Sequence, residues 1–464
     1  MKQHKAPIVK LAWGCIVLLV LGLAMLQAMP ETVEKGDSED PTGLVMVQLQ
    51  AEYMLGVSEI LGATDEIASQ AVLLDAGTVG QRQRYIAFML ALGDNGAAKQ
   101  SALKLHSELA EAGLELTAPQ SKTQEALDGL ADGLQVLPSD SSSLEASLGW
   151  FGELVEADKT RRAEMNASAR KKVLYAGGIV LFIAIAGFLG FIGLLIMFVR
   201  IVNRQVRSGL IEENSRHGIY AEVFALWLVV FTGLMMGAGL VADKFSEGNT
   251  TLAMSCSLVA FFGSLCVLFW AKYRGVSFKQ IREDIGWTCG AGLCKEVFFG
   301  IAGYGLMLPF LCGGVLITMF LMLLQGTLAG GTGGDPFGGT SGGAHPIVLE
   351  IAHGDFQLRV LLVVLAAVAA PIVEETMFRG VLYRQLRTSF RKMAFVVNVV
   401  VSVLVTSFIF AAIHPQGWVA IPALMGIAVG MNLLREWRGT ILPSMIVHGM
   451  SNGLVTSMML IFLS

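Results

Sequence analysis

The chain has 464 residues, of which 54% are hydrophobic and 15% charged, and its mean hydropathy is +0.62. This composition excludes an ordinary soluble globular protein and predicts a polytopic membrane protein. The net charge of −4 combines two unlike regions, because residues 31–170 carry 23 acidic and ten basic side chains while the rest of the chain is basic. Basic residues in the loops of a membrane protein indicate topology, so we expect no nucleic-acid partner.

The chain begins with lysines at positions 2, 5 and 10, followed by the apolar run Leu11–Met29. A cleaved secretory signal has the same charged start, but this run is long and ends in a poor cleavage site. We therefore expect residues 1–30 to form an uncleaved signal anchor that serves as the first transmembrane helix.

Residues 31–170 are polar and acidic, and apolar residues recur in them at helical spacing. Four such stretches are separated by glycine and proline: 44–73, 82–112, 123–137 and 144–169. This pattern predicts a small helical domain inserted outside the cytoplasm. No catalytic pattern is visible in it.

Eight further segments are long enough to cross a hydrocarbon core of about 30 Å. They are residues 173–199, 219–241, 251–270, 297–324, 358–381, 393–413, 418–434 and 440–463. The predicted fold class is therefore all-α, a polytopic transmembrane bundle of about nine spans.

The loop charges give this bundle an orientation. Basic residues gather in every second connection, which the positive-inside rule assigns to the cytoplasm. These residues are Arg200, Arg204, Arg207, Lys272, Arg274, Lys279, Arg282, Arg384, Arg387, Arg391, Lys392, Arg435 and Arg438. We expect an integral protein of a bacterial cytoplasmic (inner) membrane, with the N-terminus inside and residues 31–170 outside.

Residues 171–345 form the next predicted domain, a set of transmembrane helices that ends in the glycine-rich stretch Gly326–Gly343. Glycine runs bind phosphates where they join a strand to a helix and a Lys-Ser/Thr pair follows. That context is missing here, so we expect a flexible linker. The last domain, residues 346–464, carries the chemistry.

Two adjacent carboxylates, Glu374 and Glu375, lie in an otherwise apolar span. An ionised carboxylate in hydrocarbon costs at least about 2.5–3.5 kcal/mol, so two together indicate a function. Arg379 follows Glu375 by four residues and shares its helix face, which predicts an ion pair. Glu374 points about 100° away and has no partner in its own helix, which makes it the candidate general base.

Two histidines and an asparagine complete the predicted site. If spans 358–381 and 393–413 form a hairpin, we expect His414 to reach nearly the depth of Glu374, at 1.5 Å per residue. His448 and Asn452 are four residues apart and share a face of the last span. Glu374 and His414 could deprotonate a water for attack on a peptide carbonyl, and the His448 ring N–H with the Asn452 amide could stabilise the oxyanion.

The same residue types leave a metal requirement open. Two histidines and a glutamate match a catalytic zinc ligand set in type, with Glu375, His414 and His448 as candidates. They do not have the His-Glu-x-x-His spacing of many zinc proteases. We therefore assign no cofactor, and a divalent metal such as zinc stays an alternative.

The motifs Glu374-Glu375-x-x-x-Arg379, Phe410-x-x-x-His414 and His448-x-x-x-Asn452 resemble, in order and spacing, those of the CPBP family of intramembrane proteases. That family includes the type II CAAX prenyl proteases. The resemblance covers about residues 358–463. It implies an intramembrane endopeptidase, described as either a metalloendopeptidase or a glutamate-type protease, with the same six catalytic residues.

Two other classes of function fit the same residues. One is a non-catalytic membrane scaffold or bacteriocin-immunity-like protein that keeps these groups as buried polar contacts. The other is a proton-coupled transporter, although the polar residues cluster in one half of the chain and show no inverted repeat. Under the protease reading, the partners are the lipid bilayer and a membrane protein or peptide substrate. The sequence determines neither a prenyl group on the substrate nor the oligomeric state.

Overall fold

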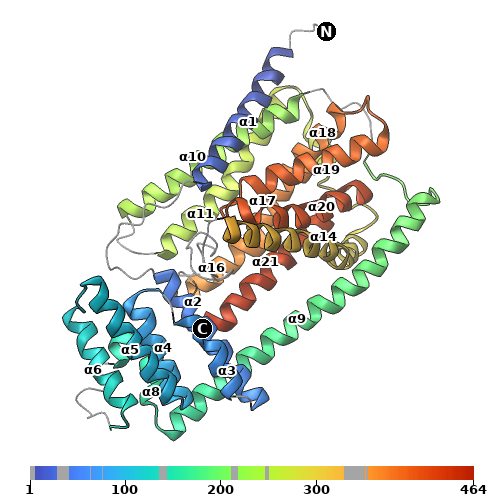
Figure 1. Ribbon diagram of the computed structural model, residues 1–464. Helices are drawn as coiled ribbons and strands as arrows, with labels where there is room; N and C mark the ends of the chain where they lie inside the picture. The colour runs from blue at the N-terminus through green and yellow to red at the C-terminus, as the bar shows by residue number, and fades with distance from the viewer. Residues whose placement is uncertain are drawn as a thin grey trace. The chain divides into compact units, whose positions relative to one another are not determined.

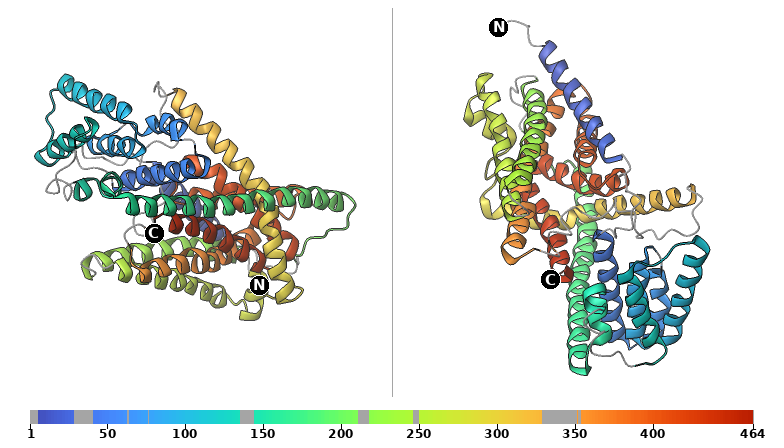
Figure 2. Two further views of the ribbon diagram at one scale, coloured as in Figure 1. Left: turned by 90° about the horizontal axis from the view of Figure 1, so that it is seen from below. Right: turned by 90° about the vertical axis from the view of Figure 1, so that its left-hand side faces the viewer.

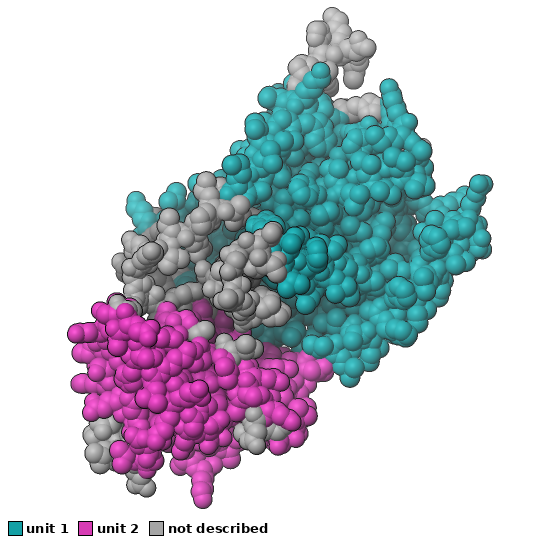
Figure 3. All heavy atoms as spheres, viewed as in Figure 1, with its two compact units in different colours: residues 1–31, 179–460 teal, residues 32–178, 461–464 magenta. Residues whose placement is uncertain are grey.

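The computed structural model describes residues 6–28, 41–62, 64–75, 77–134, 144–210, 218–245, 250–328, 351 and 354–463. Within these ranges the regular structure is helical, with no strands, which confirms the predicted all-α class. The chain divides into two compact units, coloured separately in Figure 3. Unit 1 comprises residues 1–31 and 179–460, and unit 2 comprises residues 32–178 and 461–464.

Unit 2 is a bundle of short helices around its own apolar core, which includes Phe88, Leu127 and Phe151. These helices are drawn in blue to blue-green in Figures 1 and 2. The bounds are α2 Pro41–Leu61, α3 Thr64–Ala71, η1 Val72–Leu74, α4 Val79–Leu92, α5 Asn95–Ala112, α6 Ala118–Ala131 and α8 Trp150–Glu156. The long helix α9, Lys159–Val202, belongs to both units, which divide between Gly178 and Ile179.

The breaks between these helices are finer than the sequence pattern predicted. The stretch expected as one helix over residues 82–112 is two helices, because α4 ends at Gly93 in the left-handed conformation and the Asp94 carboxylate then caps α5 by accepting the Ala97 N–H. At the other end of the domain, α9 continues without a break from Lys159 into the predicted second transmembrane span.

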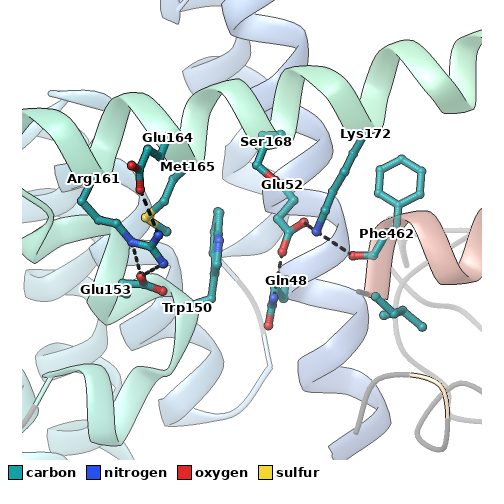
Figure 4. A pocket seen from close by; sticks show the side chains of 12 residues that line it. Gln48, Glu52, Trp150, Glu153, Arg161, Glu164, Met165, Ser168, Lys172 and Phe462 are labelled. Carbon is teal, nitrogen blue, oxygen red and sulfur yellow. Dashed lines mark hydrogen bonds and ion pairs between the residues drawn. The ribbon is translucent and has the colours of Figure 1, made fainter. Parts of the chain in front are cut away.

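A cavity of about 430 Å³ lies in unit 2 (Figure 4). On one side of it the Glu52 carboxylate accepts a hydrogen bond from Lys172 at 2.7 Å. On the other side Arg161 pairs with Glu153 and Glu164. The charged side chains that line this cavity thus largely neutralise one another, and none of the residues predicted for chemistry lines it.

Unit 1 contains the remaining helices and the residues predicted for chemistry. In chain order they are α1 Ala6–Ala28, α10 Ile219–Phe245, α11 Thr250–Ser264, η2 Leu265–Val267, α12 Leu268–Tyr273, α13 Phe278–Ile285, α14 Leu293–Leu328, α16 Phe356–Val364, η3 Leu365–Ala369, α17 Ala370–Glu375, η4 Thr376–Leu382, α18 Tyr383–Ser389, α19 Phe395–Ala412, η5 Trp418–Ala420, α20 Ile421–Arg438 and α21 Leu442–Leu463.

Among the described residues, nine helical segments are long and apolar enough to cross a membrane, as the sequence predicted. They are α1, α9, α10, α11 with α12, α14, α16 to α18, α19, η5 with α20, and α21. The chain is therefore an integral membrane protein. Most of the predicted glycine-rich linker, residues 329–343, lies outside the described residues, and residues 326–328 are the end of α14.

Two kinds of packing hold unit 1 together. Helices α14 and α20 lie side by side (Figure 1), so close that a Cβ on Gly426 would be 2.4 Å from the Phe310 carbonyl oxygen. Small residues allow this approach between membrane helices. Aromatic rings fill the centre, where Phe378 packs edge-on against Trp227 of α10 and Phe410 of α19. The helices that carry the predicted site residues pack around this centre.

Candidate active site

Both glutamates lie on one long helical span, residues 356–389, which we call the site helix. It contains two wider π-helical segments: η3 lies just before α17, and η4 just after it. Pro371 accounts for the first, because it has no N–H and its ring clashes with the carbonyl four residues back. In η3 the Ala370 N–H bonds to the Leu365 carbonyl, five residues back. Such π segments are rare and occur frequently at functional sites.

The Glu374 carboxylate faces both predicted imidazoles. Its Oε2 atom is 3.7 Å from Nε2 of His414 and 3.8 Å from Nε2 of His448. Oε2 is buried and has no hydrogen-bond partner among the described residues. These separations exceed the 2.7–3.2 Å or so of a direct hydrogen bond, so Glu374 makes no direct hydrogen bond to either ring.

The other nitrogen of each imidazole has a fixed acceptor. Nδ1 of His414 lies at hydrogen-bonding distance from the Phe410 carbonyl oxygen. Nδ1 of His448 is 2.8 Å from Oε1 of Glu375. A carbonyl and an ionised carboxylate only accept, so each Nδ1 carries the proton and donates it. In the neutral rings the lone pair of each Nε2 is therefore turned toward Glu374.

Glu375 forms the ion pair that the sequence predicted. Arg379 Nη1 is 2.8 Å from the same Oε1 atom that accepts from His448, and both Glu375 and Arg379 are fully buried. The Arg379 guanidinium also lies 4.6 Å from the centre of the Phe410 ring. Glu375 thus neutralises a buried cation and orients an imidazole, while Glu374 stays free of both tasks.

Asn452 contacts the site helix at a different place. Its Nδ2 donates a hydrogen bond of 2.8 Å to the carbonyl oxygen of Ala366, inside η3. The prediction that His448 and Asn452 share a face of α21 is confirmed, because both side chains contact the site helix. The Ala366 carbonyl is a partner that the sequence did not indicate.

The turn before α21 sets the height of His448 in the membrane bundle. The structure places the turn before α21 against the loop that follows α13: Thr440 Oγ1 donates to the carbonyls of Gly286 and Thr288, and the Ile441 N–H donates to Gly286. This turn fixes where α21 begins, and His448 reaches both glutamates from there.

The structure therefore brings Glu374, Glu375, His414 and His448 into one cluster, supported by Arg379. Sequence reasoning missed the parts of the site that are backbone. The Phe410 carbonyl orients His414, and the Ala366 carbonyl binds Asn452. Pro371 was a visible signal for the contact between Asn452 and the Ala366 carbonyl, since a proline inside a helix leaves a carbonyl without its usual donor.

The metal candidates can be compared with this geometry. Nε2 of His414 and Nε2 of His448 both face Oε2 of Glu374, which makes Glu374 the third donor on that side of the cluster. Oε1 of Glu375 is engaged with Arg379 and His448, and its Oε2 has no hydrogen-bond partner among the described residues. Two histidines and a glutamate are a suitable donor set for zinc. No group of three such side chains among the described residues has the spacing of a preformed metal site.

Comparison with known families identifies this region. Residues 356–454, about a fifth of the chain, match the sequence model described as type II CAAX prenyl endopeptidase Rce1-like. The match includes all six predicted site residues and confirms the family resemblance inferred from the three motifs. Comparisons with curated proteins and with solved structures gave no match. The matched segment is thus similar to a family of CAAX-type intramembrane proteases.

Proposed function

We propose that this protein is an intramembrane endopeptidase in which Glu374 and His414 activate a water for attack on a peptide carbonyl. The proposal is carried by the buried, unpartnered Glu374 Oε2 atom that faces two imidazole Nε2 atoms at 3.7 and 3.8 Å. A carboxylate in a membrane span costs free energy, so its presence there indicates a function. The similarity of residues 356–454 to CAAX prenyl endopeptidases supports a peptide bond as the target.

The first step is deprotonation of the water. A water bound by Glu374 and His414 donates one proton toward Oε2 and the other toward the Nε2 lone pair, because Nδ1–H of His414 is committed to Phe410. As the water oxygen forms a bond to the carbonyl carbon, Glu374 takes up a proton. The electron pair of the carbonyl moves to its oxygen, which becomes the oxyanion.

The second step needs a donor for that oxyanion and a proton for the leaving amine. His448 in its doubly protonated form offers Nε2–H to the oxyanion while Glu375 accepts from Nδ1. When the tetrahedral intermediate collapses, the carbon–nitrogen bond breaks and Glu374 returns its proton to the amine nitrogen. The products are a new carboxylic acid, which passes its remaining proton to the new amine or to solvent, and the amine itself; the site regains its starting charge.

A bound divalent metal is a variant of this proposal. Glu374, His414 and His448 are the residues that would hold it. Zinc in such a site lowers the pKa of a bound water to about 7. Glu375 and Arg379 would keep the same positioning roles, since their contacts do not involve Nε2 of either histidine.

We propose a membrane protein or membrane-associated peptide as substrate, with a prenylated CAAX peptide as one candidate. The proposed topology places the N-terminus inside and residues 31–170 outside a bacterial cytoplasmic membrane. It is supported by the alternation of basic connections between the spans. An acidic domain outside the membrane is consistent with an extracytoplasmic partner.

The test compares wild-type protein with Glu374→Gln in liposomes that contain candidate substrates. The candidate substrates are identified by comparative proteomics of cells that express either form, and they are the polypeptides that are cut only in cells with the wild-type protein. Losing the base should lower turnover by about 10²–10⁴ with the fold intact. The matched control is Glu222→Gln, which changes another buried carboxylate of unit 1, paired with Arg274 and Trp270, and should retain cleavage.

Four results would change this assignment. If Glu374→Gln cleaves as wild type does, the base is assigned wrongly. A scaffold would be favoured if the wild type cleaves nothing and the Glu374→Gln variant keeps the wild-type phenotype. A transporter would be favoured by proton-coupled uptake into liposomes. Loss of wild-type cleavage in chelator, with recovery on adding zinc, would establish the metal variant.

A further inference from the structure

The site helix has a carbonyl that its own backbone cannot satisfy. In the five-residue register of η3, Ala370 N–H bonds to Leu365 O, so the next donor, for the Ala366 carbonyl, would be residue 371. That residue is proline and has no N–H. In the low dielectric of a membrane span such an oxygen needs another donor.

Asn452 supplies that donor from α21, at 2.8 Å. Next to it, α21 approaches the same kink closely, because a Cβ on Gly449 would be 2.7 Å from the Ala367 carbonyl oxygen. Proline and asparagine are therefore complementary across two helices: Pro371 exposes the Ala366 carbonyl, and Asn452 binds it.

The contact lies beside the proposed chemistry. Helix α21 is attached to the site helix at two points, through His448 to Glu375 and through Asn452 to Ala366 (the segments α17 and α21 are labelled in Figure 1). Between those two points on the site helix lies Glu374, whose Oε2 must face Nε2 of His448. A second attachment fixes the rotation and height of one helix against the other, which a single contact cannot do.

We propose that Asn452 is a positioning residue, which binds the carbonyl exposed by Pro371 and so holds Glu374 opposite His448. This inference rests on the proposed protease function. It differs from the role predicted for Asn452 from sequence, a donor to the oxyanion, because one of the two amide N–H groups is given to the backbone of the site helix. A displacement of about 1 Å at a reacting group lowers rates by about 100-fold.

The two roles predict opposite results for a compensating substitution. Pro371→Ala restores a backbone N–H at the residue that would donate to Ala366 in the π register. If Asn452 acts through that carbonyl, Asn452→Ala should lower kcat by about 10- to 100-fold with little change in KM, and Asn452→Ala combined with Pro371→Ala should recover most of it. An oxyanion donor would not be replaced by an N–H in another helix.

The experiment measures kcat, KM and thermal unfolding for wild type, the two single variants and the double variant, all as full-length protein in liposomes or detergent. The control pairs Asn452→Ala with Pro443→Ala, because Pro443 lies in the first turn of α21, where the missing N–H has no intrahelical acceptor. This control should rescue nothing.

The outcomes separate the two proposals. Recovery of both unfolding temperature and kcat in the double variant supports the positioning role. Recovery of the unfolding temperature while kcat stays low overturns it, since Asn452 would then act on the substrate directly. Additive unfolding temperatures also overturn it. If wild type cleaves nothing, the protease function fails, and coupling of the unfolding temperatures still shows whether Asn452 substitutes for the N–H that Pro371 lacks.

Discussion

The buried pair Glu375–Arg379 allows the sharpest prediction about stability. Both side chains are fully buried and their charged atoms are 2.8 Å apart. The other contacts of Arg379, a 3.5 Å hydrogen bond to the Ala428 carbonyl and the face of the Phe410 ring, do not cancel its charge. Glu375→Gln therefore leaves an uncompensated buried cation, and we expect it to lower the free energy of unfolding by about 3–5 kcal/mol.

Removing the charge of Arg379 as well should reverse most of this loss. Replacement of a whole buried ion pair by neutral side chains of similar volume is often neutral or stabilising. Glu375→Gln with Arg379→Met should thus be more stable than Glu375→Gln alone. The glutamine keeps an oxygen that can accept Nδ1–H of His448, so the double variant should also keep the tautomer of that ring.

The assay is equilibrium or thermal unfolding in detergent, with cleavage measured on the same samples. Glu374→Gln is the matched comparison, because no change at Arg379 should restore its activity. A Glu375→Gln protein that is as stable as wild type would refute the ion-pair argument. So would a double variant no more stable than the single one.

Two other measurements test unit 2 and the proposed topology. Oε1 of Glu156 is buried and has no hydrogen-bond partner among the described residues, and burial with the nearby Glu145 raises the pKa of Glu156 from 4.5 to about 7. The folded state then binds the proton more tightly, so stability falls as pH rises from about 4.5 to about 7. In Glu156→Gln the unfolding temperature should vary less with pH over that window, and at pH 8 it should be higher than that of wild type. A variant whose unfolding temperature falls with pH as steeply as that of wild type would contradict this. For the topology, single cysteines placed within residues 31–170 of a cysteine-free protein should react with a membrane-impermeant thiol reagent in intact cells, whereas cysteines placed beside Arg204 or Arg387 should not. Labelling of the cysteines beside Arg204 or Arg387 would show that the proposed orientation is wrong.

The sequence alone determined the class of protein and predicted the side chains that the structure brings into one cluster. Transmembrane spans are found from local hydropathy, and residues four apart on a helix share a face whatever the rest of the fold does. For that reason the nine spans and the Glu375–Arg379 pair could be predicted and are confirmed. The meeting of Glu374 with His414 followed from helix rise along a hairpin, and the two side chains are 3.7 Å apart.

Only the tertiary structure decided which atoms face one another. The proton position on His414 depends on the Phe410 carbonyl and that on His448 depends on Glu375, which lies 73 residues away. The same holds for Asn452, whose acceptor is a backbone oxygen 86 residues away in a π segment. Hydrophobic periodicity reports which face of a helix is buried, but it carries no information about backbone groups exposed by a change of helical register, and these groups set the geometry of this site.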